Sequence, residues 1–157
     1  MKKTNIGMLP EHRKEVAMLL NTVLADEFAL YIKTKKYHWN MGGMEFISLH
    51  KFLDELAEQQ LELIDEIAER NLHIGEYAIG SLSAFQKLTN MVEDDEAKDV
   101  KEMIANLVND HETLIRYLRA HADEVLDKYK DAGTNDYFIQ WMEAHEKIAW
   151  MLRAHLS

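Results

Sequence analysis

The sequence predicts an all-α protein, a single domain built as a bundle of four long helices. Apolar residues recur at three- and four-residue spacing over four long segments, the pattern of amphipathic helices. One proline and six glycines leave little turn chemistry, so few and long elements are expected. A chain of 157 residues is long enough for one substantial core and too short for two comfortable ones.

Each helix is predicted from its apolar stripe and its end signals. The first extends over about 10–38 and begins at Pro10, a favourable first-turn residue. The second covers about 45–72 and the third about 94–130. The fourth begins at Thr134, which is predicted as its N-cap, and continues to about residue 156.

The connections predict how the helices are arranged. The first and second helices are joined by NMGGM and the third and fourth by DAGTN, and such short connections make antiparallel neighbours. The middle connection, roughly 71–93, is long and contains a helical stretch of its own, SLSAFQKLTN. One long crossover in a four-helix bundle is the ferritin-like topology. We expect a short flexible N-terminal tail over 1–8 and a single ferritin-like domain over 9–157.

Charge is distributed unevenly along the chain, whose net charge is −10. Residues 1–40 carry seven Lys/Arg and four Asp/Glu, a balance of +3, and the remainder carries eleven and twenty-four, a balance of −13. An acidic body of this kind repels phosphate backbones and attracts cations, so it favours metal over nucleic acid. The absence of cysteine excludes thiolate metal sites and thiol catalysis. No export signal or transmembrane-length segment is visible, so we expect a cytoplasmic protein without a membrane partner.

The second predicted helix carries an acidic arc beside its apolar stripe. On a helical wheel His50, Asp54, Asp65 and Glu69, together with two further glutamates, fall within an arc of about 120°. A charge run is most often a solvated face. Here the carboxylates border the apolar edge and lack the i,i+4 lysines that a merely soluble helix would use, which favours a binding role.

Axial distance divides these groups into two half-sites. Asp54 and Asp65 are separated by a helical rise of roughly 16 Å, and His50 and Glu69 by roughly 28 Å. No single ion with bonds of about 2 Å bridges such gaps. Both pairs share one midpoint near residues 59–60, so an antiparallel two-fold crossing there would place His50 and Asp54 against Glu69 and Asp65 of a second copy. Two equivalent sites would result, and His38 could supply a second imidazole to each.

The ligand types restrict the metal. Oxygen and nitrogen ligands without sulfur suit Fe(II), Mn(II) or Zn(II), and a majority of carboxylates favours iron or manganese. Di-iron bundles that hold metal within one subunit use Glu-x-x-His pairs, and none is present in this sequence.

These residues resemble the signature of the Dps family, the mini-ferritins named for DNA protection in starved cells. The resemblance is carried by HW, by LH twelve residues later, by the aspartate and glutamate of IDEIAER, and by the HEKIAWMLRAHL ending, and it covers about 9–156. It implies a dodecamer of four-helix bundles around a hollow centre. It also implies a ferroxidase with sites at two-fold interfaces, which oxidises Fe(II), preferably with hydrogen peroxide, and stores ferric mineral to protect the cell from oxidative damage.

The resemblance also assigns roles to individual positions. The matching ferroxidase ligands, both catalytic and metal-binding, are His38, His50, Asp54, Asp65 and Glu69, with up to two iron ions at each site. Trp39 matches the tryptophan beside the centre, which is not a ligand. Asp127 and Asp136 match the acidic residues of three-fold pores.

Alternatives remain for partners and for function. Family members that grip DNA usually use a lysine-rich tail, and this tail offers only Lys2 and Lys3, so DNA binding is expected to be weak or absent, although nucleoid association is a further interpretation. The competing functions are a non-enzymatic DNA-binding helical oligomer and a manganese or zinc buffer. The remaining histidines are expected at helix surfaces or interfaces: His73, His111, His121, His145 and His155.

Overall fold

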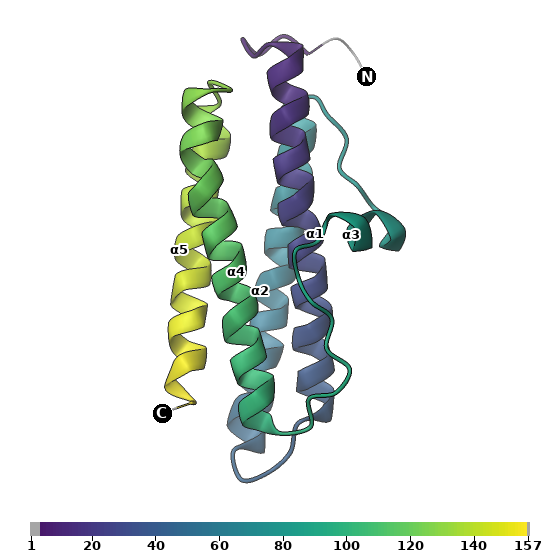
Figure 1. Ribbon diagram of the computed structural model, residues 1–157, viewed down its shortest axis with the longest axis vertical. Helices are drawn as coiled ribbons and strands as arrows, with labels where there is room; N and C mark the ends of the chain where they lie inside the picture. Colours follow the sequence, from purple (N-terminus) through teal and green to yellow (C-terminus); the bar gives the residue numbers. More distant parts are fainter. Residues whose placement is uncertain (1–3, 157) are drawn as a thin grey trace.

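The computed structural model describes residues 4–156 and shows an all-α bundle (Figure 1). Residues 1–3, which include Lys2 and Lys3 of the predicted tail, and Ser157 lie outside the described residues. Within the described part of the chain there are five helices and no strands, which confirms the predicted fold class. The helices are α1 Pro10–Asn40, α2 Phe46–His73, α3 Leu82–Leu88, α4 Val100–Asp127 and α5 Ala132–Ala154.

The four long helices form two antiparallel pairs, α1 with α2 and α4 with α5, that lie side by side (Figure 1). The turns within each pair are short, as predicted. The long crossover leaves the end of α2, carries α3 along the outer side of α1 and returns to the start of α4 at the other end of the bundle (Figure 1). This single long crossover with a short extra helix is the predicted ferritin-like topology.

Two predicted helix starts are wrong, and side-chain capping explains both. The third long helix begins at Val100 and not near Asp94, because Asp94 Oδ1 accepts hydrogen bonds from the backbone N–H groups of Glu96 and Ala97 and forms a turn. The N-cap of the last helix is Asp131, whose Oδ1 accepts from Thr134 N at 3.0 Å. Thr134 therefore lies in the first turn and not at the cap.

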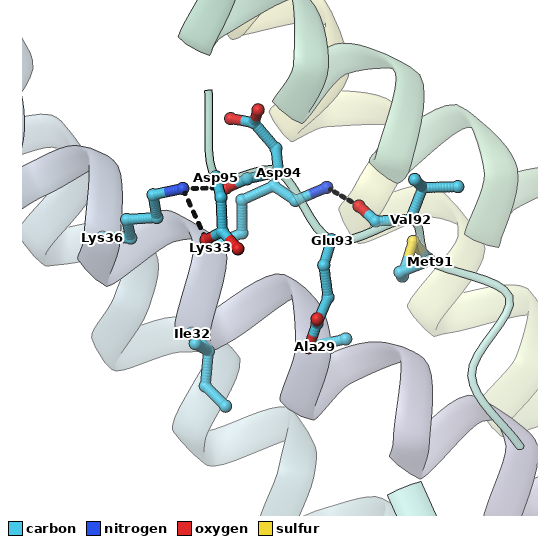
Figure 2. A pocket seen from close by; sticks show the side chains of 9 residues that line it. All are labelled: Ala29, Ile32, Lys33, Lys36, Met91, Val92, Glu93, Asp94 and Asp95. Atoms are coloured by element: carbon cyan, nitrogen blue, oxygen red, sulfur yellow. Dashed lines mark hydrogen bonds and ion pairs between the residues drawn. The ribbon is translucent and has the colours of Figure 1, made fainter. Parts of the chain in front are cut away.

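Lysines on α1 fasten the crossover to the bundle. A pocket of about 150 Å³ lies between α1 and residues 91–95. Figure 2 shows the side chains of Lys33 and Lys36 reaching from α1 toward this segment. Lys33 Nζ donates to Val92 O at 2.6 Å and to Asp110 of α4 at 2.5 Å. Lys36 Nζ donates to Asp94 O. These cations are therefore occupied with neutralising and ordering the acidic loop.

Candidate metal half-sites on α1 and α2

His38 and His50 meet where α1 and α2 begin their antiparallel pairing. Their rings stack with centroids 3.7 Å apart. His38 Nδ1 lies 2.8 Å from His50 O, and His50 Nδ1 lies 2.9 Å from His38 O. A carbonyl oxygen only accepts, so both Nδ1 atoms carry the hydrogen and both Nε2 atoms present a lone pair. This reciprocal pairing fixes two imidazoles in the tautomer that a metal ligand needs.

Asp54 lies one helical turn beyond His50, on the same side of α2 as the two imidazoles. Its Oδ1 is 3.7 Å from His38 Nε2, so carboxylate and imidazole face the same region. Lys35 Nζ, from α1, lies 2.7 Å from the same oxygen. The Lys35 hydrogen bond lowers the pKa of Asp54 and keeps this ligand ionised.

Asp65 and Glu69 are both exposed on the distal half of α2. The helical rise places Asp65 roughly 16 Å from Asp54 along the axis. Among residues 4–156, no three His, Asp or Glu side chains are arranged to hold one metal ion. The structure thus brings His38, His50 and Asp54 together within one chain and leaves Asp65 and Glu69 apart from them.

Trp39 is 67% exposed beside His38, and Lys35 Nζ lies 6.0 Å from its ring centroid. A tryptophan exposed at the edge of a polar site is available for contact with another surface. Sequence reasoning missed Lys35 as a member of this group. The available signal was its position three residues before His38 on a helix, which places both side chains on one face.

The pore candidates lie at the turn between α4 and α5. Asp127 is the last residue of α4, and Asp136 is in the first turns of α5, and both are exposed. Asp136 Oδ2 accepts a hydrogen bond from Gln140 Nε2 at 2.7 Å. The two carboxylates are therefore available at one end of the bundle, and their role in a pore stays a prediction.

Two histidine predictions are wrong. His111 and His145 are fully buried in the bundle and do not lie at a helix surface. The signal was in the sequence, because His111 falls in the apolar series with Leu107, Leu114 and Leu118 at spacings of four, three and four. Trp141 of α5 is buried as well.

No helix within residues 4–156 is both long and apolar enough to cross a bilayer.

The fold is that of a ferritin-like protein, and the family model of the ferritin-like domain matches residues 17–157. The DNA protection during starvation protein of Brevibacillus brevis is 36% identical over 155 residues, which cover 99% of this chain and 99% of that protein. The chain therefore belongs to the Dps family of ferritin-like proteins, as the sequence signature predicted.

Solved structures agree with this assignment. DpsC from Streptomyces coelicolor is 34% identical with a TM-score of 0.94, over 99% of this chain and 91% of that one. The Dps protein of Vibrio cholerae O1, described as a member of a broad superfamily of ferritin-like diiron-carboxylate proteins, is 30% identical with a TM-score of 0.92. That match covers 100% of this chain and 98% of the Vibrio protein.

Proposed function

We propose that this protein is a ferroxidase and iron-storage mini-ferritin whose metal site is shared between two chains. The observation that carries the proposal is the stacked pair His38 and His50, with both Nε2 lone pairs unused by the fold and the ionised Asp54 beside them. Membership in the ferritin-like Dps family supports iron as the metal. The acidic balance of residues 41–157 supports attraction of Fe(II) from solution.

The second half of the site is proposed to come from a two-fold related copy. His50 and Glu69 have the same midpoint along α2 as Asp54 and Asp65, near residues 59–60. If two α2 helices cross there antiparallel, the His50–Asp54 half-site of each chain meets the Asp65–Glu69 half-site of the other, which gives two composite sites. Asp65 and Glu69 are exposed on α2, as an interface contribution requires. Each composite site would contain two imidazoles and three carboxylates, a ligand set suited to one or two Fe(II) ions.

The chemistry assigned to these residues is the binding and oxidation of Fe(II) as substrate. Two Fe(II) ions supply the two electrons that cleave the O–O bond of one hydrogen peroxide, giving two Fe(III) and two hydroxide ions. The three carboxylates stabilise the higher charge of Fe(III) more than that of Fe(II), which favours oxidation. His38 and His50 remain in place during this step because their backbone hydrogen bonds fix both rings.

The assembly proposed from the family is a hollow dodecamer that stores ferric mineral in the cytoplasm. Iron would enter through three-fold pores lined by Asp127 and Asp136. DNA binding is proposed to be weak, because Lys33 and Lys36 are engaged by the crossover and Lys35 by Asp54.

The direct test is Fe(II) oxidation by the purified, metal-free protein. Anaerobic protein is mixed with Fe(II) and then with hydrogen peroxide or oxygen, and ferric absorbance is followed against a protein-free control. Rapid absorbance growth, faster with peroxide than with oxygen and followed by soluble mineral, is expected. Binding of Fe(II), Mn(II) or Zn(II) without faster oxidation than the control would contradict the ferroxidase assignment and indicate a metal buffer.

A further inference from the structure

A buried polar layer crosses the middle of the bundle. The apolar core consists of two separate clusters, one ending at Leu24 on α1 and the other resuming at Leu30. At this boundary each long helix contributes at least one polar side chain with no exposed surface. These are Asp26 and Glu27 of α1, Gln60 of α2, His111 of α4 and His145 of α5.

Three members of the layer form a continuous chain across three helices. His145 Nε2 lies 2.5 Å from Glu27 Oε1, and His145 Nδ1 lies 2.8 Å from His111 Nδ1. The imidazole of His145 thus uses both nitrogens, one toward a carboxylate and one toward a second imidazole. Glu27, His145 and His111 do not belong to the metal half-sites. Burying a carboxylate or an imidazole is costly unless it is hydrogen-bonded and its charge is compensated.

Counting protons on this chain leaves two arrangements. The 2.5 Å ion-pair distance between Glu27 Oε1 and His145 Nε2 requires a hydrogen on one of these two atoms. Only one of the two facing Nδ1 atoms can carry a hydrogen. If His111 Nδ1 donates, both histidines are neutral and Glu27 leaves a net charge of −1 in the core. If His145 Nδ1 donates, the chain holds one additional proton and its net charge is zero. The neutral arrangement avoids an uncompensated buried charge.

Within residues 4–156, the charged groups recorded nearby on α1 and α4 do not leave an uncompensated cation. On α1, Asp26 is a second acid beside Glu27. Its carboxylate accepts hydrogen bonds from Thr89 and Asn90 of the crossover. Burial raises the pKa of Asp26. Lys33 of α1 is paired with Asp110 of α4, at 2.5 Å, and these two charges cancel. From α2 the layer receives only the uncharged Gln60.

We propose that Glu27, His145 and His111 form a buried proton-binding site in which Glu27 and His145 carry two protons between them at neutral pH, one in their mutual contact and one on His145 Nδ1. These three residues also form an acid-sensitive lock, meaning that they make the stability of the bundle depend on pH. A further proton, on His111, would create two adjacent imidazolium groups in the core. That repulsion, between α4 and α5, would loosen the pairing of these helices.

Burial, and next the charge on His145, lower the pKa of His111 well below its usual value. In the unfolded chain His111 takes up a proton near its ordinary pKa of about 6.5. The unfolded state therefore binds more protons than the folded state as pH falls below that value, and stability is lost on acidification. One such group changes the unfolding equilibrium constant by at most about tenfold per pH unit for each chain.

Neutron diffraction from crystals of the wild-type protein near neutral pD locates the decisive hydrogen. We expect a deuteron on His145 Nδ1, a second between His145 Nε2 and Glu27, and a bare Nδ1 on His111. A deuteron on His111 Nδ1 would overturn the proposal, because it would mean either a chain with net negative charge or a doubly protonated pair.

Acid unfolding supplies an independent test. Thermal midpoints are compared between metal-free wild type and His111→Asn, which keeps a hydrogen-bonding group near the Nδ1 position. The pH range is about 7.5 to about 5, which brackets the ordinary imidazole pKa of about 6.5. The matched control is His121→Asn, since His121 is half-buried and bonded to Glu124. The His111 variant should lose less stability on acidification than wild type and the control. Parallel losses in all three proteins would overturn the acid-sensitive lock, and should the His111 variant not fold, the neutron result on wild type decides.

Discussion

Lys35 and Asp54 form an ion pair inside the proposed iron half-site, with Lys35 Nζ 2.7 Å from Asp54 Oδ1. Lys35 thus pairs with the carboxylate that is proposed to bind iron, so Fe(II) must displace the lysine from Asp54. The same contact lowers the pKa of Asp54 and keeps the ligand ionised before metal arrives.

Removing this internal cation should tighten metal binding. Lys35→Met is expected to increase Fe(II) affinity about two- to fivefold, the magnitude of a partly exposed ion pair. Anaerobic isothermal titration calorimetry measures the change. Lys51→Met is the matched control, because Lys51 is an exposed lysine beside His50. An equal gain in both variants would show that only general charge matters.

Loss of one distal ligand should abolish fast oxidation without harming the fold. Asp65→Asn removes a charged ligand from an exposed position. We expect Fe(II) oxidation to be at least about tenfold slower, since changing even the groups that support metal ligands lowers activity by about that factor. Its thermal midpoint should stay close to that of wild type, as for other surface substitutions. Glu62→Gln, one turn before it on α2, should oxidise Fe(II) normally in the same stopped-flow assay. Similar slowing in both variants would contradict a specific ligand role for Asp65.

Arg70 should be among the strongest polar contributions to stability. It ties the end of α2 to the start of α5, with Nε donating to Thr134 Oγ1 at 2.9 Å and Nη2 donating to Asp131 at 2.8 Å. Arg70→Met leaves the buried Asp131 without its cation and is expected to reduce the free energy of unfolding by about 3 kcal/mol.

The control for Arg70 is a surface arginine with a similar bond. Arg153 Nη1 donates to Glu112 at 2.6 Å, but both side chains are more than a third exposed. Arg153→Met should change the free energy of unfolding by about 0.5 kcal/mol or less. Urea unfolding compares the two variants, and equal losses would refute the distinction between buried and exposed pairs.

DNA should not be retarded by this protein in a gel at about 0.15 M salt, where a Debye length of about 8 Å screens its acidic surface only partly. Three of the four lysines of α1 are bound within the chain: Lys33, Lys35 and Lys36. A clear shift that weakens with added salt would contradict this and indicate an accessible basic cluster elsewhere.

Much of the fold could be predicted from the sequence because helical periodicity is a local property. The bounds of α1 and α2 agree with prediction to within two residues. The start of α4 was not predictable in the same way, because Asp94 is held by Tyr37 OH at 2.5 Å, a contact between residues far apart in the chain. Such tertiary contacts override local propensity.

The candidate site was predictable only in part. Spacing on one helix separated His50 and Asp54 from Asp65 and Glu69, since rise per residue is fixed. The reciprocal bonds of His38 and His50 depend on how α1 packs against α2, so they required the structure. The buried contacts of His145 with Glu27 and His111 were not predicted, because histidine is found both at surfaces and in cores and its residue type alone does not indicate burial.

The central claim, a site shared between chains, is tested most directly by mixing two inactive variants. His50→Ala removes a ligand from the half-site of His50 and Asp54. Glu69→Ala removes a ligand from the half-site of Asp65 and Glu69. Each variant alone should be inactive. In a mixed dimer, one composite site receives both defects and the other receives none. After subunit exchange proven by native mass spectrometry, we expect fast Fe(II) oxidation to return in part. Mixed assemblies that remain as inactive as their parents would contradict the two-fold construction.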